Sequence, residues 1–312
     1  MKKFIVTTTI NKPTLATLKF CEISNKDNWN FVVVGDSKTP HQDYEALQKK
    51  YPKSFIYLHP EFQEKNYKEL SDIIGWKSIQ RRNIGYIYAY QEGAEIIATV
   101  DDDNIPYDDW GKEIFIGQNI EIDLFNHMDY DVFDPISATS HDHCWHRGYP
   151  IEYVPNKNRI EYKGKTHRKV LIQADFWDGD PDIDASCRLT KKPILMFEKF
   201  KPFGSNQLSP FNSQNTFLHR DVMKYYAVLP HVGRMDDIWG GYIAQHFFKD
   251  SVIYNKATVY QDRNVQDLVT NLEKEILGYR QTLPLLQDLE NFYNYFPEKT
   301  KKFWDIYTNY FK

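Results

Sequence analysis

The stretch EIIATVDDDN, residues 95–104, decides the fold. Residues 96–100 are apolar and rich in β-branched side chains, which predicts a buried strand. Asp101, Asp102 and Asp103 follow without a break. Alternation along a strand would place Asp101 and Asp103 on one side, where two carboxylates suit Mg²⁺ or Mn²⁺. A solvated acidic turn is the alternative, but three carboxylates at the end of a buried strand repel one another unless a cation compensates.

Further short apolar runs predict more strands for the same sheet. Helical patterns over residues 64–73 and 77–92 separate two of these runs, and Gly93 stands where a helix C-terminal cap belongs. Strands that alternate with helices predict an α/β fold with a mostly parallel sheet. Residues 105–165 have the irregular pattern of an insertion or long loops, and helical patterns dominate after Asp236. The other predicted strands are residues 4–6, 31–34, 55–58, 170–172 and 193–197.

The composition excludes several classes of protein. The chain has 312 residues, a hydrophobic share of 41% and a formal charge of −4, so it is neither disordered nor marked as a partner of nucleic acid. Three cysteines far apart (Cys21, Cys144 and Cys187) do not make a disulfide framework. The sequence shows no signal-peptide core and no apolar run near the length of a membrane span, which predicts a cytoplasmic protein.

Polar side chains follow several of the predicted strands. The first strand ends in threonines and is followed by Asn11, and the second ends in Gly35-Asp36-Ser37. In parallel sheets ligands bind at the carboxyl ends of the strands, so these residues and the acidic triplet are the first candidates for a site. Ordinary β propensity for the threonines, and a turn at Asp36, are the alternatives.

At residues 81–104 the sequence resembles the region around the DxD motif of GT-A-fold glycosyltransferases, and in particular the STELLO-type family. The resemblance continues in ordered blocks over most of residues 4–280. These blocks are VVVGDSKTP (32–40), RGYPIE (147–152), DGDPDIDASCRLT (178–190), PFNSQNTFLHRD (210–221), DDIWGGYIAQ (236–245) and YQDRN (260–264).

The resemblance implies a GT-A fold, a mixed sheet flanked by helices, with a nucleotide-sugar donor and Mn²⁺ or Mg²⁺ at Asp101 and Asp103. It implies a catalytic domain over residues 1–262, with a nucleotide-binding half (1–104) and an acceptor half (105–262), followed by a helical extension over 263–312. A UDP-sugar is the expected donor, and a glycan or lipid-linked hydroxyl is the expected acceptor. The plant relatives have an N-terminal membrane anchor that is missing here, which again predicts a cytoplasmic protein. The more distant reversibly glycosylated polypeptides, which are UDP-arabinopyranose mutases, add a mutase or retaining transferase as an alternative; an inactive sugar-nucleotide-binding scaffold is a third.

Within that frame the expected site residues fall into groups. An inverting enzyme needs a carboxylate base, for which we expect Asp237 with Asp236 as the substitute. Lys77 and Arg81, four residues apart on the predicted helix, would reach a diphosphate, whereas Arg82 would lie on a solvated face. The nucleoside would contact Thr8, Thr9, Asn11 and Asp36. The remaining nucleotide- and sugar-binding candidates are Asp101, Asp102, Arg147, Asp180, Asp182, Asp184, Asn212, Gln214, Asn215 and Arg263. Structural alternatives are a Pro/Gly turn for residues 178–184 and turns or caps for 212–215.

Three further features leave their alternatives open. His141 to His146 contains three histidines and a cysteine, but these are crowded for one zinc ion and no second ligand pair lies at finger spacing. A third donor to the cation at the acidic triplet could be His219 or His246. The aromatic and basic tail over residues 291–312 either packs on the domain, which we favour, or lies on a membrane surface.

Overall fold

Four parallel strands form the first half of the sheet, as the sequence predicts. The computed structural model describes residues 1–263 and 265–311. In it, β1 (Lys3–Thr9), β2 (Trp29–Gly35), β3 (Phe55–Leu58) and β4 (Ile96–Val100) lie in the order β3-β2-β1-β4 and all pair in parallel. Their side chains are almost all buried, as the apolar runs require.

Helices connect these strands, with boundaries that differ from the expected ones. The predicted helix over 64–73 is two short helices, α3 (Pro60–Asn66) and α4 (Lys68–Ile74), which Tyr67 separates with a non-helical φ of −136°. The predicted helix over 77–92 begins later, because Lys77 has a φ of +59°; it consists of the single turn η1 (Ile79–Arg81) and α5 (Arg82–Gln91). The others are α1 (Leu15–Asp27) and α2 (His41–Lys50).

The close fit of α5 on the sheet depends on one glycine. A Cβ on Gly85 would lie 2.5 Å from the Cγ1 of Val6 and 2.8 Å from the Cγ2 of Val34, so only glycine lets the helix approach β1 and β2 this closely. After α5, Gly93 has a φ of +80°, which agrees with its expected place beyond the end of the helix.

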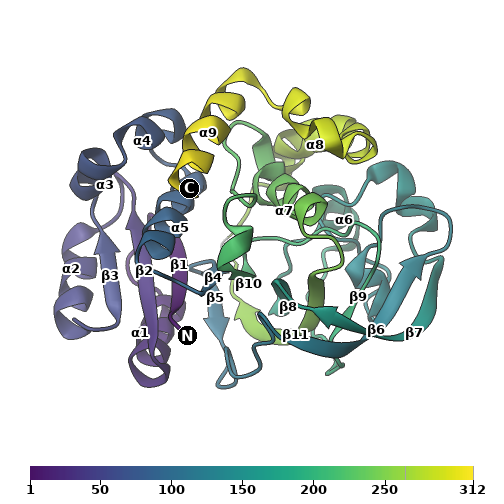
Figure 1. The fold of residues 1–312 in the computed structure, drawn as a ribbon, viewed down its shortest axis with the longest axis horizontal. Coiled ribbons are helices and arrows are strands. Elements are labelled where there is room, and N and C mark those ends of the chain that lie inside the picture. Colours follow the sequence, from purple (N-terminus) through teal and green to yellow (C-terminus); the bar gives the residue numbers. More distant parts are fainter. Residues whose placement is uncertain (264, 312) are drawn as a thin grey trace.

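The second half of the sheet is mixed. β10 (Asn215–His219) runs antiparallel between β4 and β8 (Ile172–Gly179), and β11 (Val252–Gln261) lies parallel to β8. The sheet continues through β9 (Phe203–Gly204) and β6 (Asn119–His127) to β7 (Ile160–Lys169), while β5 (Asn104–Pro106) pairs with β11. Figure 1 shows the parallel half at the left and the β6–β7 ribbon at the far right.

Three sequence expectations in this half were wrong. The long loops expected over 105–165 include β5, β6 and the start of β7, and Ile120, Ile122 and Leu124 alternate with polar residues in β6 as in a half-buried strand. In place of the strand expected at 193–197, the structure has a single β-bridge between Leu195 and Gly179. The apolar run there is not a buried strand, because Ile194 and Met196 are exposed to solvent. The strand expected at 170–172 is the turn into β8, which begins at Ile172.

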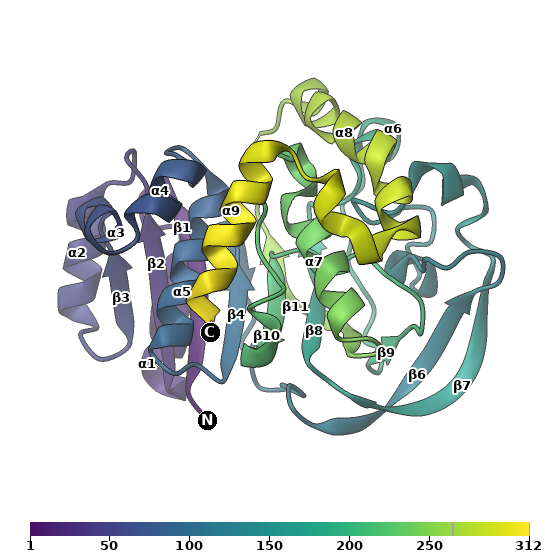
Figure 2. The ribbon, with the colours of Figure 1, turned by 45° about the horizontal axis from the view of Figure 1, so that its top comes forward.

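The C-terminal region is helical and packs on the sheet. α7 (Asp236–Phe247) precedes β11, and α8 (Leu268–Gln287) and α9 (Glu298–Thr308) follow it; α6 (Ala185–Lys191) contacts α8. Figure 2 shows α9 running beside α5, and α9 also contacts α4. The short 3-10 turns are η2 (Pro135–Ala138), η3 (Ile151–Asn156), η4 (Arg220–Val222), η5 (Gly233–Met235), η6 (Leu289–Tyr295) and η7 (Asn309–Phe311).

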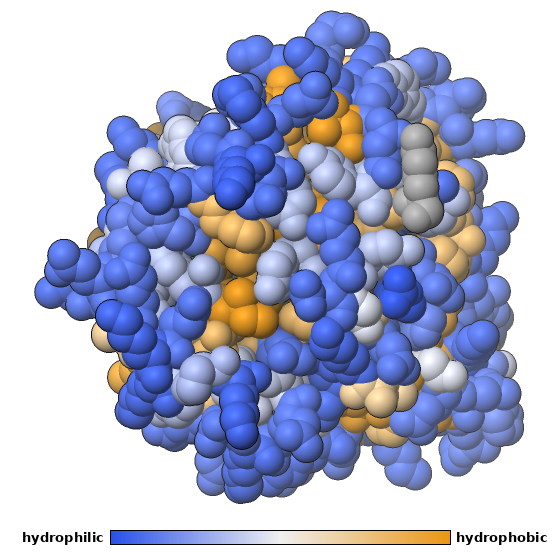
Figure 3. Space-filling model, turned by 60° about the vertical axis from the view of Figure 1, so that its left-hand side comes forward, coloured by the Kyte–Doolittle hydropathy of each residue, from blue (hydrophilic) through white to orange (hydrophobic). Residues whose placement is uncertain are grey.

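The aromatic tail packs on the body of the protein, as we favoured. Phe303 and Tyr307 are fully buried, and the Tyr307 hydroxyl donates to the backbone oxygen of Tyr226 at 2.9 Å. The aromatic rings that a membrane-surface helix would insert are therefore in the core. In the described part of the chain, no helix combines the length and the apolar character that crossing a membrane requires. The face shown in Figure 3 is mostly hydrophilic, with hydrophobic residues in small separate areas.

The topology brings polar loops together at one edge of the sheet. β1, β2, β4, β8 and β11 all end at this edge, and β10, which runs the other way, begins there. The α/β class is thus confirmed, with a mixed sheet flanked by helices and a helical C-terminal extension. The division at residues 104 and 262 remains a prediction, and the sheet is hydrogen-bonded across the first of these boundaries by the β4–β10 pair.

Candidate active site

Two adjoining cavities lie at this edge. The larger has a volume of about 560 Å³ and the smaller about 190 Å³, and Lys77, Ser78 and Ile79 line both. The smaller cavity is also lined by Thr8, Thr9, Ile10, Asn11, Asp36 and Asp102. The larger is also lined by Gln80, Asp101, Arg147, Asp182, Ser213, Gln214, His231, Gly233, Arg234, Asp236, Asp237, Arg263, Gln266, Asn271 and Lys274. The structure therefore brings together most of the predicted site residues.

The small cavity is built from the ends of β1 and β2. Asp102 accepts hydrogen bonds from the Thr9 hydroxyl and, at 3.0 Å, from the Asn11 side-chain amide. Asp36 is buried and accepts from the backbone amides of Lys77 at 2.9 Å and Ser78 at 3.1 Å. The carboxylate expected to contact a nucleoside thus fixes the 77–78 loop, which forms part of the cavity wall.

The two adjacent arginines have roles opposite to those expected. Arg81 does not face a ligand: it is fully buried, donates to Gln63 Oε1 at 2.6 Å and to the Gly75 carbonyl at 2.9 Å, and stacks on Trp76. Arg82 is not on a solvated face either. The helix begins five residues later than predicted, so the i, i+4 argument that paired Lys77 with Arg81 does not apply.

Arg82 connects the acidic triplet to the loop before β10. Its Nη2 lies 2.5 Å from Asp101 Oδ1, and its Nη1 donates to the backbone oxygen of Ser213 at 2.9 Å and to the Ser213 hydroxyl at 2.8 Å. Ser213 in turn donates from its amide to Asp237 Oδ2 at 2.8 Å. Only 1% of the Arg82 surface is exposed.

The acidic triplet lies in a turn. β4 ends at Val100, and the Asn104 amide donates to the Asp101 carbonyl, so strand alternation does not determine where Asp101 and Asp103 point. Among the described residues, Asp103 Oδ1 is a buried atom without a hydrogen-bond partner. Burial, followed by the nearby charge of Asp101, raises the pKa of Asp103 to about 7, and Arg263 opposes that rise.

An arginine cluster forms the floor of the large cavity. Arg147 Nη2 lies 2.6 Å from Asp182 and 3.0 Å from Asp237, and Arg234 Nη2 lies 2.9 Å from Asp182. Arg263 lies 3.5 Å from the same carboxylate. Burial alone would raise the pKa of Asp182, but the three arginines hold it well below the usual value.

The two acids at the start of α7 have different partners. Asp237 is held by Arg147 and by two bonds from Ser213. Asp236 accepts from Gln80 Nε2 at 2.7 Å and lies 3.7 Å from Arg147. Burial, followed by the charge of Asp237, raises the pKa of Asp236 to about 7.

Several predicted ligand-binding residues have structural partners instead. Asp180 pairs with Arg188, and Asp184 caps α6 by accepting from the amides of Ser186 and Cys187. Asn215 is bonded to Trp110, Thr258 and the backbone of β8. Asn212 lies near Asp182, and Gln214 lines the large cavity, so these two remain candidates.

The sequence did not predict that residues of the C-terminal extension form part of the wall of the large cavity. Asn271 and Lys274 on α8 line the large cavity together with Gly233 and Arg234. Gly233 has a φ of +66°, and a Cβ on it would lie 2.2 Å from the carbonyl oxygen of Lys274. Glu275, on the same helix, pairs with Arg234 at 2.8 Å. No local motif marks these contacts, because they depend on the docking of α8.

The comparisons with known proteins agree with the sequence blocks. No family model matches the chain. Two curated proteins of Arabidopsis thaliana are similar to it: "Probable glycosyltransferase STELLO2", 27% identical over 250 residues and 70% of this chain, and "Probable glycosyltransferase STELLO1", 26% identical over 276 residues and 78% of this chain.

The chain is similar to these two proteins over most of its length. It spans about a third of the length of these curated relatives, 30% and 33%. Among solved structures, residues 1–349 of TarS from S. aureus align with 99% of this chain and 90% of their own length, at 12% identity and a TM-score of 0.44.

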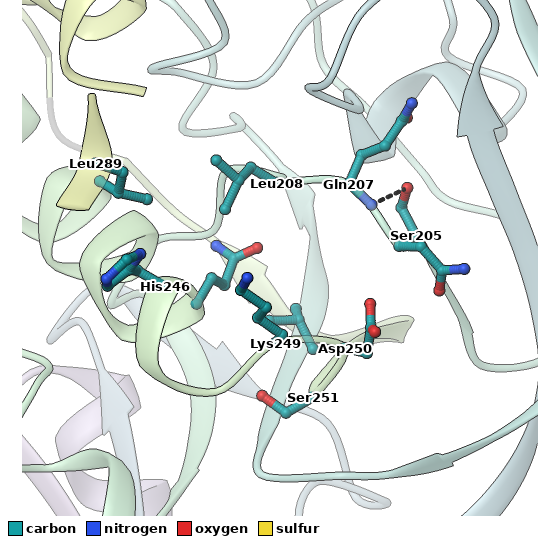
Figure 4. A pocket seen from close by; sticks show the side chains of 11 residues that line it. Ser205, Gln207, Leu208, His246, Lys249, Asp250, Ser251 and Leu289 are labelled. Carbon is teal, nitrogen blue, oxygen red and sulfur yellow. Dashed lines mark hydrogen bonds between the residues drawn. The ribbon is translucent and has the colours of Figure 1, made fainter. Parts of the chain in front are cut away.

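Neither histidine considered as a third metal donor lies at the acidic triplet of this chain. His219 pairs with Ile96 at the start of β4, the end opposite Asp101. His246 lines a separate cavity of about 330 Å³ (Figure 4), with residues such as Ser205, Lys249 and Leu289. In the described residues, no group of three His, Cys, Asp or Glu side chains is arranged to hold a metal ion.

The His141–His146 segment of this chain has hydrogen-bond partners within the protein. His146 is buried, with Nδ1 2.8 Å from the Arg147 carbonyl, and His141 Nε2 lies 2.9 Å from the Met196 carbonyl. The last residue of the predicted block 260–264, Asn264, lies outside the described residues.

Proposed function

We propose that this chain is a glycosyltransferase that moves a sugar from a nucleotide-diphosphate sugar, UDP-linked, to an acceptor hydroxyl with inversion. The observation that carries the proposal is Asp236: a buried carboxyl with a pKa of about 7 that opens a helix at the wall of a 560 Å³ cavity. A general base is most effective when its pKa is close to the working pH. The similarity to proteins named as probable glycosyltransferases supports the same reaction class.

The division into two cavities suits the two parts of such a donor. The small cavity, with the Thr9 and Asn11 side chains and the Ser78 backbone, would receive the nucleoside. Lys77 lines both cavities and Arg263 lines the larger, so their positive charges would face the diphosphate between nucleoside and sugar. The acceptor would then enter on the side of Asn271 and Lys274.

Asp236 is a better base than Asp237, which the sequence favoured. The carboxylate of Asp237 is already held by Arg147 and by the amide and hydroxyl of Ser213, so it is less free to contact an acceptor. In the proposed step Asp236 takes the proton of the acceptor hydroxyl, and that oxygen attacks the anomeric carbon. The bond from this carbon to the diphosphate oxygen breaks, and the nucleoside diphosphate leaves with the bonding pair.

In this proposal a divalent cation is held at the acidic triplet, and Asp103 is the residue that supports it. The buried Oδ1 of Asp103, which lacks a partner among the described residues, and its raised pKa are the properties of a carboxylate that a cation would complete. Asp101 already has Arg82 on one oxygen. Bound Mn²⁺ or Mg²⁺ would stabilise the charge of the departing diphosphate.

Calorimetry with UDP, with and without Mn²⁺, tests this proposal. We expect binding to the wild type that requires Mn²⁺ and that Asp103→Asn removes. Asp175→Asn is the matched control, because Asp175 also has a pKa of about 7 but is more deeply buried and has Gln173 and Thr258 as partners. Binding of UDP without Mn²⁺, or loss of binding in both variants, would count against the cation at Asp103.

Product analysis separates the remaining alternatives. NMR of the product should show the inverted anomer of the donor sugar. A retained anomer, or rearrangement of the sugar nucleotide without an acceptor, would instead support the retaining transferase or mutase. Binding of UDP-sugar without any turnover would indicate a scaffold.

A further inference from the structure

Three buried arginines, Arg81, Arg82 and Arg168, differ in their hydrogen-bond partners. Arg81 bonds to Gln63, Gly75 and Ser71, and Arg168 bonds to Ser205, Asn206 and Val252. None of these partners is among the described residues that line the two active-site cavities. The partners of Arg82, by contrast, are Asp101 and Ser213, and both line the large cavity.

The contacts of Arg82 form a continuous chain across the site. Asp101 follows β4, Arg82 begins α5, and Ser213 precedes β10. The Ser213 hydroxyl accepts from Arg82 Nη1 at 2.8 Å and donates to Asp237 Oδ2 at 3.0 Å. The carboxylate of Asp237 then forms an ion pair with Arg147. The backbone amide of Asp237 donates to Asp236 Oδ1 at 3.1 Å. Five segments, at residues 82, 101, 147, 213 and 236–237, are thereby linked by direct contacts.

We propose that Arg82 is a positioning residue. It fixes the position of Asp101, which lies near the donor, relative to the start of α7, which carries the proposed base. This role rests on the proposed function. Arg82 is not among the described residues that line the cavities, so it acts through Asp101 and Ser213. A planar guanidinium can bond to both partners at fixed angles, whereas a lysine ammonium is a point charge that would hold one of them.

The charges around Arg82 agree with this role. Burial raises the pKa of Asp101, and the charge and hydrogen bond of Arg82 oppose that effect. The other titratable groups close to Arg82 are Tyr86 and Tyr226, which burial keeps neutral. Asp101 and Arg82 are therefore each other's nearest opposite charge in a buried setting, where breaking the pair leaves a charge uncompensated.

Transfer kinetics of Arg82→Lys test the proposal, with Arg168→Lys as the matched control. We expect Arg82→Lys to lower kcat roughly 10- to 100-fold, as displacement of reacting groups does. We also expect the KM for the donor to rise, because Asp101 loses its fixed place, and the acid limb of the pH–rate profile to shift, because the Asp236–Asp237 pair loses its fixed geometry. Arg168→Lys should keep the wild-type kcat and pH profile.

Equal kcat and equal pH profiles in Arg82→Lys and Arg168→Lys would overturn the proposal, provided that the wild type is active. Wild-type protein that neither binds UDP with Mn²⁺ nor transfers sugar would instead contradict the proposed function. If Arg82→Lys fails to fold, judged by circular dichroism and thermal unfolding, Ser213→Ala decides. This variant removes the hydroxyl that joins Arg82 to Asp237 and should lower kcat at unchanged affinity for UDP; wild-type kcat would reject the positioning role.

Discussion

Gln80 Nε2 donates a 2.7 Å hydrogen bond to Asp236 Oδ2, although 156 residues separate the two along the chain. Gln80 belongs to the turn η1 between the parallel strands, and Asp236 opens α7 in the mixed half. The bond joins the two halves of the candidate active site at the carboxyl that we propose as the base. It also stabilises the charged form of that carboxyl, which gives a first prediction.

Gln80→Met should make Asp236 less acidic. The hydrogen bond from Gln80 lowers the pKa of Asp236 against the effect of burial, so its removal raises that pKa above about 7. A base must be deprotonated, and the acid limb of the pH–rate profile should therefore move to higher pH. If the acid limb of the pH–rate profile did not move, it would reflect the titration of a group other than Asp236.

Asp236→Asn should abolish the base while keeping the shape of the side chain. We expect kcat to fall by roughly 10²- to 10⁴-fold, the usual contribution of a general base, with UDP affinity retained. Asp237→Asn should lower thermal stability more, because it disturbs the bonds from Arg147 and Ser213. A larger loss of kcat in Asp237→Asn, at equal folded fraction, would return the role of base to Asp237.

Asp175→Asn should change how stability depends on pH. Burial raises the pKa of Asp175 to about 7 from the ordinary 3.8, so folding takes up a proton between these values. The stability that this proton contributes is complete below about pH 4 and is lost as the pH rises through 7. The free energy of unfolding of the wild type should therefore fall relative to the variant between pH 4 and 7, on the order of a few kcal/mol. Parallel curves from urea titrations would contradict this.

Arg147→Met should leave three carboxylates without their shared cation. Loss of one partner from a buried ion pair typically costs about 3–5 kcal/mol. Burial opposes ionisation of Asp182, and Arg147 is the first of the groups that hold its pKa below 3.8. The part of the destabilisation that comes from Asp182 should therefore shrink as the pH falls below 4. The matched control is Arg159→Met, whose exposed pair with Asp129 should contribute only about 0–1 kcal/mol.

Gly233→Ala should push α8 away from the large cavity. The φ of +66° disfavours alanine, and its Cβ would meet the Lys274 carbonyl at 2.2 Å. Gly164→Ala is the control, because Gly164 has a φ of +88° but nothing within 4 Å of the added Cβ. Both should lose roughly 1 kcal/mol or more of stability in thermal unfolding, but only Gly233→Ala should also weaken acceptor binding. Equal acceptor KM in the two variants would show that α8 does not form the acceptor wall.

The first hundred residues were predictable because their signals are local. Residues 96–100 and the other three apolar runs are strands buried on both sides, and the acidic triplet marks their common edge. The ribbon β6–β7 lacks a continuous apolar run, because it is only half-buried: apolar and polar residues alternate in β6, and most of β7 is polar.

The sequence indicated which residues gather at the large cavity, but it did not indicate which contacts each of them makes. Asp182, Arg147, Asp236 and Asp237 lie together at the large cavity, as the sequence blocks indicate. Arg81 and Arg82 have identical side chains, and only the late start of α5 decides which of them reaches Asp101. Contacts such as Gly233 to Lys274 depend on helix docking, which no short motif records.

The large cavity takes side chains from residues as distant as Lys77 and Lys274. A nascent polypeptide therefore has no complete cleft until α8 has left the ribosome and settled against η5. Truncated chains that end at β11 would keep the acidic triplet, but one side of the large cavity would be open to water. A screen for ligand binding would therefore not recover them, even where their sheet is folded.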